Sequence, residues 1–251
     1  MRFSWRANLS GPLIVAHRGS SIRAPENTLA AFVRAMSEKA DAIELDVRLT
    51  KDRELVACHD ATVDRCSDGS GKVSDLTLRE LKRFSAGGWF GKRFSDERFP
   101  SLREVFELCG DHIGINIELK FNPFDRKSPL IERCCELIGA FHLCDSLLIT
   151  SFHHASVARL RELRPDIPAG LLLHPAHLVR KSVRLFPRLY DFDYLVLGGG
   201  SLRKSIVEDA HRHGVKVGEF TVNTRRRMER AFRFGLDAII TDDPLIAEKF
   251  R

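Results

Sequence analysis

Long hydrophobic runs are missing from this sequence of 251 residues. No apolar stretch approaches the ~20 residues that a helix needs to cross a bilayer. The first twelve residues include Arg2, Trp5 and Arg6 but lack the apolar core of a secretory signal peptide. We therefore expect a cytoplasmic protein without stable membrane insertion.

Cysteine motifs are also missing. None of the six cysteines forms a Cys-x-x-Cys pair, and Cys134 and Cys135 are adjacent, which suits neither a disulfide framework nor a zinc site. Most have apolar neighbours in the sequence, as Cys58 does, and we interpret them as small buried thiols. A reducing compartment is the simpler expectation.

A basic tail is absent as well, although the formal net charge is +6. The excess of Lys and Arg is scattered through predicted helices, so it would attract anionic ligands without indicating a dedicated nucleic-acid binder. The run Arg225-Arg226-Arg227 with Arg230 is more typical of a solvated helix face than of a nucleic-acid site. We expect no nucleic-acid partner.

No repeat of fixed period is visible, which excludes a solenoid. Instead, eight apolar runs of strand length alternate with segments of helical period. In the first such helix, Leu29, Phe32, Val33 and Met36 form one predicted buried face. The predicted strands are 12–16, 42–47, 113–119, 146–150, 168–173, 194–197, 215–220 and 237–240. Further helices are predicted at 129–141, 155–163, 176–185 and 201–213, the last with Ser201 as its cap. A helix from Thr224 would bury Met228, Ala231 and Phe232, and a short final helix would end at Phe250. This alternation predicts a single domain over residues 1–251, folded as a (β/α)8 TIM barrel.

Residues 61–111 interrupt the alternation, because this segment is too long for a simple connection. It contains a turn-rich DGSG, helical pieces at 74–83 and 102–109, and an aromatic GGWFGKRF. We interpret it as a small insertion on the second strand–helix unit, over the barrel mouth, since its apolar content is slight for a separate core. Residues 54–58 are predicted to extend the second strand after a turn.

Three acidic residues stand near the ends of neighbouring predicted strands, where barrel active sites gather. Glu44 and Asp46 project from the same face of the second strand, and Glu118 lies near the end of the third. Several carboxylates without a countercharge would be very costly inside a barrel. Their convergence predicts a divalent metal, Mg²⁺ or Ca²⁺, although nearby histidines leave a softer metal open. The alternative is a salt-bridge network with Arg18, Arg48 or Lys120.

Two histidines flank these acids. His17 and His59 both follow strand ends, and histidine titrates near neutral pH, so they are the natural proton-transfer pair. The planar guanidinium of Arg18 suits a phosphate, to which Lys120 would add a point charge. Lys120 would equally serve as a partner for an acid of the cluster.

These residues lie in motifs that resemble the glycerophosphodiester phosphodiesterases. The motifs are His17-Arg18-Gly19, Pro25-Glu26-Asn27-Thr28, Glu44-Leu45-Asp46, His59-Asp60 and Asn116-Ile117-Glu118-Leu119-Lys120. The likeness continues through AGGWFGKRF, FPSLREVFEL, FTVN (Phe220 to Asn223) and TDDP (Thr241 to Pro244), so it covers nearly the whole chain in order.

The resemblance implies a (β/α)8 barrel that hydrolyses glycerophosphodiesters to sn-glycerol 3-phosphate and an alcohol. By this likeness Glu44, Asp46 and Glu118 would hold the metal. His17 and His59 would be acid and base, in an order that the sequence leaves open, and Arg18 and Lys120 would meet the phosphate. The implied partner is a small glycerophosphodiester substrate.

Several positions leave alternatives open. Phe220 stands where the family often has Trp, so the pocket wall for the alcohol would differ. Glu26 is expected to touch the site, whereas Asn27 or Thr28 would cap a helix, and Gly19 is expected to let the backbone approach the ligand. The alternative enzyme is a lysophospholipase D or sphingomyelinase D-like relative, which would need apolar surface such as Trp89, Phe90 and Phe94. A non-catalytic phosphate binder is a further alternative, and homodimer formation stays open.

Overall fold

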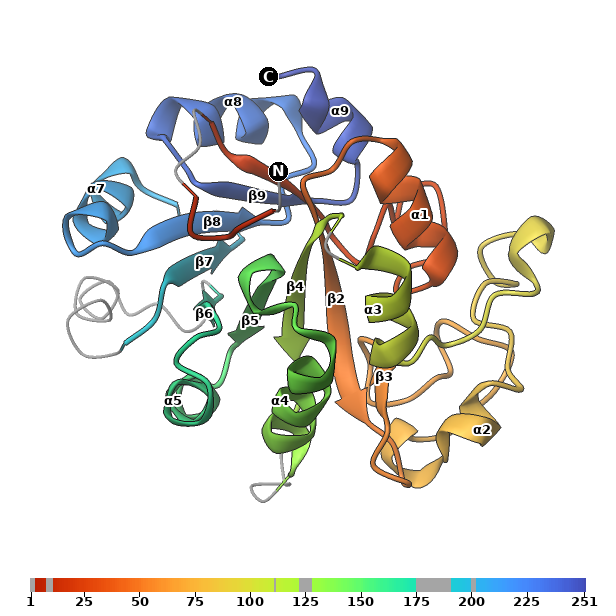
Figure 1. Cartoon of the computed structure of the whole chain (residues 1–251). Helices are drawn as coiled ribbons and strands as arrows, with labels where there is room; N and C mark the ends of the chain where they lie inside the picture. The colour runs from red at the N-terminus through yellow and green to blue at the C-terminus, as the bar shows by residue number, and fades with distance from the viewer. Residues whose placement is uncertain (1–2, 8–10, 111, 122–127, 175–190, 200–201) are drawn as a thin grey trace.

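The computed structural model describes residues 3–7, 11–110, 112–121, 128–174, 191–199 and 202–251. Within these residues, eight parallel strands form a closed barrel, as the pairing of β1 with both β2 and β9 shows. Figure 1 shows the helices around the strands. The strands are β1 (Leu13–Ala16), β2 (Ala42–Leu49), β4 (Gly114–Leu119), β5 (Leu147–Ser151), β6 (Ala169–Leu173), β7 (Tyr194–Gly198), β8 (Lys216–Phe220) and β9 (Ala238–Thr241). The predicted (β/α)8 TIM barrel is confirmed.

The helices follow the strands in the predicted order. They are α1 (Leu29–Ser37), α3 (Leu102–Cys109), α4 (Leu130–Phe141), α5 (His154–Leu163), α7 (Lys204–Arg212), α8 (Arg225–Phe234) and α9 (Pro244–Glu248). The helix predicted at 176–185 lies outside the described residues. On α1, Val33 was placed wrongly in the buried face, because it is 50% exposed. The N-cap of α7 is Arg203 rather than Ser201, which also lies outside the described residues.

Side chains alternate along each strand, and this divides the apolar core into two parts. Outward-facing residues pack against the helices in the main cluster, which contains Ile43, Leu45 and Ile117. Inward-facing residues, among them Leu13, Leu148 and Tyr194, form a second cluster with Trp5. The Nε1 of Trp5 donates to the Ser146 carbonyl at 2.9 Å, and the Tyr194 hydroxyl donates to the Trp5 carbonyl at 2.8 Å. Apolar side chains therefore close the N-terminal end of the barrel, where Lys216 also donates to the Trp5 carbonyl at 2.9 Å.

The segment after β2 differs from the predicted extension of that strand. β3 (Leu55–Ala57) runs antiparallel to β2, because a turn with a hydrogen bond from the Arg53 N–H to the Thr50 carbonyl reverses the chain. β3 therefore lies beside the barrel as the second strand of a hairpin. The strand continues the sheet at β2 without taking part in the closed ring.

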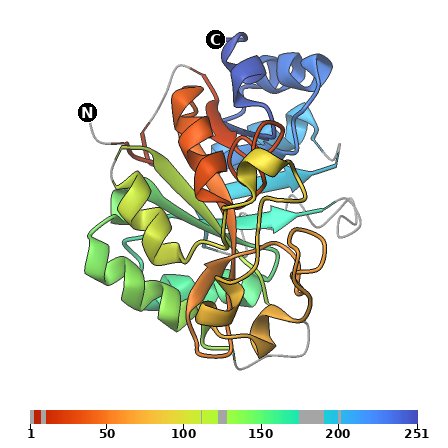
Figure 2. The ribbon, with the colours of Figure 1, turned by 90° about the vertical axis from the view of Figure 1, so that its right-hand side faces the viewer.

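The insertion after β3 contains η1 (Val73–Asp75), α2 (Leu78–Leu81) and η2 (Lys92–Phe94). Figures 1 and 2 show it as an orange to yellow segment on one side of the barrel. Its apolar residues form a small cluster with Val56 of β3, separate from the two barrel clusters; the other members are Cys58, Val63, Cys66, Val73, Leu81, Ala86 and Phe99. The helix that follows, α3, packs into the main barrel core instead. A capping box begins α3, in which Ser101 and Glu104 satisfy each other's backbone N–H groups.

Candidate active site

The carboxylates of Glu44, Asp46 and Glu118 converge at the C-terminal ends of β2 and β4. Asp46 and Glu118 are register partners on these adjacent parallel strands. One oxygen of each of the three residues lies within 4.8 Å of the others. Glu44 and Asp46 are almost fully buried, with 3% and 1% exposure, so the cluster is held away from bulk water.

Burial and mutual repulsion give these three acids different pKa values. Burial, followed by the charge of Asp46, raises the pKa of Glu44 to about 8 and that of Glu118 to about 7. Burial also opposes ionisation of Asp46, but the nearby charges of Lys120 and Arg18 prevail and hold its pKa at about 2. Burial and mutual repulsion therefore disfavour the ionisation of all three carboxylates at neutral pH, and a bound cation would reverse this.

Two of the three cations that the sequence suggested, Arg18 and Lys120, form salt bridges with the cluster but leave it incompletely neutralised. Arg48 donates to the His59 carbonyl instead, at 2.9 and 2.7 Å. The Nζ of Lys120 contacts Glu118 and lies 3.1 Å from Oδ1 of Asp46, and Nε of Arg18 lies 3.2 Å from Oδ2 of Asp46. Glu44 accepts the backbone N–H of Arg18 at 2.9 Å, and no side-chain cation pairs with it among the described residues. Oδ1 of Asp46 and Oε1 of Glu118 are both buried, and the single ammonium group of Lys120 is shared between them. A cluster of three carboxylate oxygens is a donor set that suits Mg²⁺ or Ca²⁺.

Each of the two histidines has its Nδ1 next to an aspartate. In His17 this nitrogen lies 2.5 Å from Oδ1 of Asp242, and in His59 it lies 2.7 Å from Oδ1 of Asp60. Burial lowers the pKa of His17, but the bond to Asp242 and the charge of Glu44 outweigh burial and raise it above its ordinary value. For His59 burial prevails and lowers the pKa. In both rings, Nε2 is the nitrogen left to meet a ligand.

Glu26 links Arg18 to the insertion. Arg18 donates to Oε1 of Glu26 at 2.8 Å, and Arg65 donates to both oxygens of Glu26, at 2.8 and 2.7 Å. Arg65 also donates to Asp60, the partner of His59, at 2.6 Å. The carboxylate of Glu26 is thus occupied by two arginines, so its direct role is to hold Arg18.

Two residues that sequence reasoning did not assign to the site support its main groups. The amide of Asn27 donates to Oδ2 of Asp46 at 2.9 Å and accepts the Asp46 N–H at 3.1 Å. Asp242 is itself held by Asn223 at 2.5 Å and by Ser21 at 3.2 Å. The available signals were the motifs PENT and TDDP, which contain Asn27 and Asp242.

The turn after β1 packs closely against α1. Gly19 has a φ of +82°, and a Cβ there would lie 2.6 Å from the backbone and Cβ of Ala31 on α1. The helix by itself therefore requires glycine at this position. Thr28, not Asn27, caps α1 by accepting the Ala31 N–H at 3.3 Å.

Phe220 stands at the C-terminal end of β8, on the inner face of the barrel. Its ring lies edge-on to that of Phe152 with 5.9 Å between centroids, and Nζ of Lys120 lies 5.8 Å from the Phe152 centroid. Phe152 is 40% exposed. An aromatic wall therefore adjoins the cationic part of the site.

Fold and site define the class of protein: a (β/α)8-barrel enzyme with buried acids and aspartate-paired histidines at the C-terminal ends of its strands. None of the described helices is long and apolar enough to cross a membrane.

The comparisons with known proteins are specific. Residues 17–246 match the Glycerophosphoryl diester phosphodiesterase family. A glycerophosphodiester phosphodiesterase of Caldanaerobacter subterraneus is 40% identical over 92% of this chain and 94% of its own, and one of Bacillus altitudinis is 36% identical over 95% and 97%. The solved structure of an Oleispira antarctica phosphodiesterase in complex with the product sn-glycerol-3-phosphate has a TM-score of 0.86 and 30% identity over 95% of this chain and 96% of that one. The chain belongs to the glycerophosphoryl diester phosphodiesterase family, as the motifs predicted, and is a phosphoric diester hydrolase.

Proposed function

We propose that this enzyme hydrolyses glycerophosphodiesters to sn-glycerol 3-phosphate and a free alcohol, with the help of a divalent cation. The observation that carries this proposal is the convergence of three carboxylates beside two aspartate-paired histidines, in a chain whose relatives are named for this activity.

Glu44, Asp46 and Glu118 would hold the cation, with Mg²⁺ and Ca²⁺ as the two candidates. When bound, such an ion neutralises the acids and stabilises the charge that develops on a phosphoryl oxygen. Lys120 and Arg18, which now balance the acids, would then be available to the phosphate. Glu26 would keep the Arg18 guanidinium in position for a bidentate contact.

His17 and His59 would transfer the protons. The hydrogen bond to Asp242 favours the protonated form of His17, whereas burial favours the neutral form of His59. We therefore assign His59 as the base, which takes the proton of the attacking hydroxyl. His17 is the acid, which protonates the departing alkoxide. The attacking hydroxyl belongs to water or to the neighbouring carbon of glycerol.

The assignment is tested with two substrates that differ in their leaving group. His17→Ala and His59→Ala should each lower kcat for glycerophosphocholine by at least ~10²-fold. With a p-nitrophenyl ester of glycerol phosphate, whose leaving group needs no proton, His17→Ala should regain most of its activity while His59→Ala stays slow. Equal losses on both substrates for both variants would refute the assignment. Full activity of the wild-type enzyme in EDTA would refute the role of the cation.

The alternative substrate class is lysophospholipids or sphingolipids. Exposed apolar side chains favour it: Ile22 lies in the loop after β1, and Trp89 lies in the insertion, with 57% and 45% exposure. Rates on glycerophosphocholine and lysophosphatidylcholine distinguish the two classes. A higher kcat/KM for lysophosphatidylcholine would show that lysophospholipids are the substrate class. The proposed roles of the cation and the histidines would be unchanged.

A further inference from the structure

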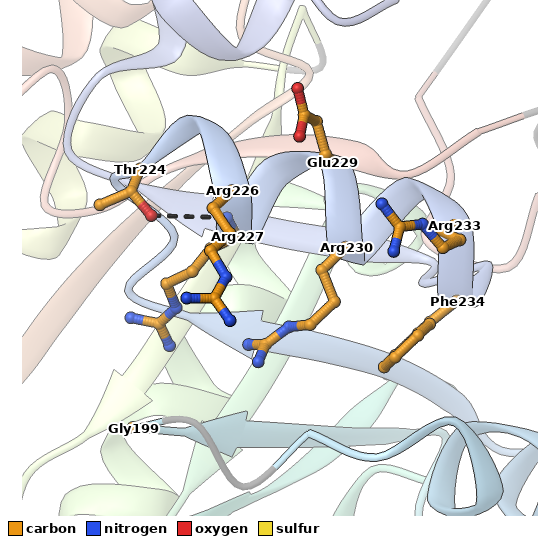
Figure 3. Close-up of a pocket in the computed structure, with 8 residues that line it drawn as sticks. All are labelled: Gly199, Thr224, Arg226, Arg227, Glu229, Arg230, Arg233 and Phe234. Carbon is orange, nitrogen blue, oxygen red and sulfur yellow. Dashed lines mark hydrogen bonds between the residues drawn. The ribbon is translucent and has the colours of Figure 1, made fainter.

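A cationic cavity lies outside the barrel wall. It has a volume of about 750 Å³ and is lined by α8 and by Gly199, the residue after β7. Figure 3 shows the side chains of Arg227 and Arg230 extending from α8 on the side of Gly199, with Phe234 farther along the helix. Phe220 belongs to the inner cluster of the barrel, so the preceding residue, Glu219, faces outward, toward α8. The cavity and the carboxylate site are thus on opposite sides of β8.

The base of the cavity carries more positive than negative charge. Glu219 is fully buried, and its Oε1 accepts hydrogen bonds from Arg227 at 2.9 Å and from Arg230 at 2.6 Å. Arg227 is fixed further by a bond to the Thr221 carbonyl at 2.7 Å. Two guanidinium groups therefore share one carboxylate oxygen, and their planes are held by the fold before any ligand arrives.

The rim adds charge that no described acid balances. Arg226 and Arg233 line the cavity, and neither forms an ion pair with another described residue. The remaining acid of the lining, Glu229, is paired with Arg225 at 2.8 Å. The sequence suggested that these arginines lie on a solvated helix face. Two of them are instead bonded to a buried carboxylate beside a cavity.

We propose that this cavity binds a phosphate monoester that carries an organic group. Arginine binds phosphate through two parallel hydrogen bonds, and four arginines line one wall here. Phe234 lines the cavity beyond Arg230, and the part of its ring that is not packed against the barrel core would contact the organic group. The volume lies within the range of about 300–1,000 Å³ that is usual for small-molecule sites. Two sources share this chemistry: a nucleotide, which would place its base on Phe234, and sn-glycerol 3-phosphate, which would not use the ring.

The test is calorimetric titration of the full chain with AMP, sn-glycerol 3-phosphate and inorganic phosphate. Arg226→Gln/Arg233→Gln should weaken binding at this site by at least ~10-fold, because each Gln removes a charge-assisted contact while keeping helix propensity. The single substitutions, each expected to act in the same direction, keep the result interpretable if the double variant is unstable. Arg79→Gln, at an exposed arginine of α2 outside the lining, is the matched control.

Arg18→Gln, which alters the site inside the barrel, should leave AMP binding within a factor of about two, since the two sites do not share residues. Phe234→Ala should weaken AMP if a nucleotide is the ligand, and should leave sn-glycerol 3-phosphate unchanged. The proposal is overturned if neither AMP nor sn-glycerol 3-phosphate binds to the Arg18→Gln variant, or if Arg226→Gln/Arg233→Gln binds both ligands as the wild type does. Hydrolytic activity plays no part in this readout, so the result is independent of the proposed function.

Discussion

Cation binding by Glu44, Asp46 and Glu118 should depend steeply on pH. In the cation-free chain, the pKa of Glu44 is raised to about 8 and that of Glu118 to about 7, by burial and then by the charge of Asp46. A carboxyl group must lose its proton before it binds a metal ion. Cation binding therefore releases protons below about pH 8, and affinity rises with pH.

The size of the effect follows from these two values. Between about pH 6 and about pH 9, ionisation of Glu44 contributes roughly two decades of affinity and that of Glu118 roughly one. The Kd for Mg²⁺ or Ca²⁺ should fall ~10³-fold over this interval, which corresponds to about 4 kcal/mol.

The stability of the cation-free fold should change in the opposite direction. Both glutamates have a pKa above the unfolded value of 4.5, so the folded chain binds more protons than the unfolded chain in this range. Their contribution to stability is present below about pH 4.5 and is lost as pH rises toward about 8. Saturating divalent cation should remove most of this loss, because it binds the folded state.

Titration calorimetry in two buffers of different ionisation enthalpy measures both the affinity and the number of protons released. Glu44→Gln is the control, because it removes the group with the higher pKa and should reduce proton release by about one per ion below pH 7. A wild-type Kd that stays within about threefold between pH 6 and pH 9, with no proton release, would show that the three acids do not form the cation site.

Three further substitutions test individual contacts. Asp242→Asn keeps the shape next to His17 but removes the negative charge 2.5 Å from its Nδ1; kcat should fall by at least ~10²-fold with unchanged circular dichroism, and an unchanged kcat would exclude this contact from the mechanism. Ser101→Ala removes the capping box of α3 and should lower the free energy of unfolding in urea by about 1 kcal/mol, whereas Ser74→Ala, in the short helix η1 where no side chain caps, should change it far less. Trp5→Ala empties the closed end of the barrel and should cost about 3–5 kcal/mol; a loss below about 1 kcal/mol would mean that Trp5 does not complete the core.

The sequence predicted the barrel because its eight strand runs and the helical periods after them are local signals. The same alternation placed Glu44 and Asp46 on one face of β2, and the shared strand direction brought Glu118 beside them. One local prediction was wrong: Val33 follows the helical spacing of α1, yet its side chain is 50% exposed.

Long-range partners of the site could not be predicted from spacing. Asp242 meets His17 across 225 positions of sequence, and Arg65 meets Glu26 across 39. Such contacts depend on how β9 closes against β1 and on how the insertion folds back, neither of which leaves a periodic pattern. The antiparallel β3 was missed for a related reason, since an apolar run does not reveal the direction in which its strand runs.

The hydrogen bonds of Arg65 bear on whether the insertion after β3 can be exchanged between relatives. The insertion packs around a separate apolar cluster, and Arg65 connects it to the barrel by donating hydrogen bonds to Glu26 and Asp60. A donor segment from another relative would therefore keep most of its internal packing after transfer, provided that it also fits Val56 of β3. The donor segment would also need an arginine at the position of Arg65, so that the hydrogen bonds to Glu26 and Asp60 are kept.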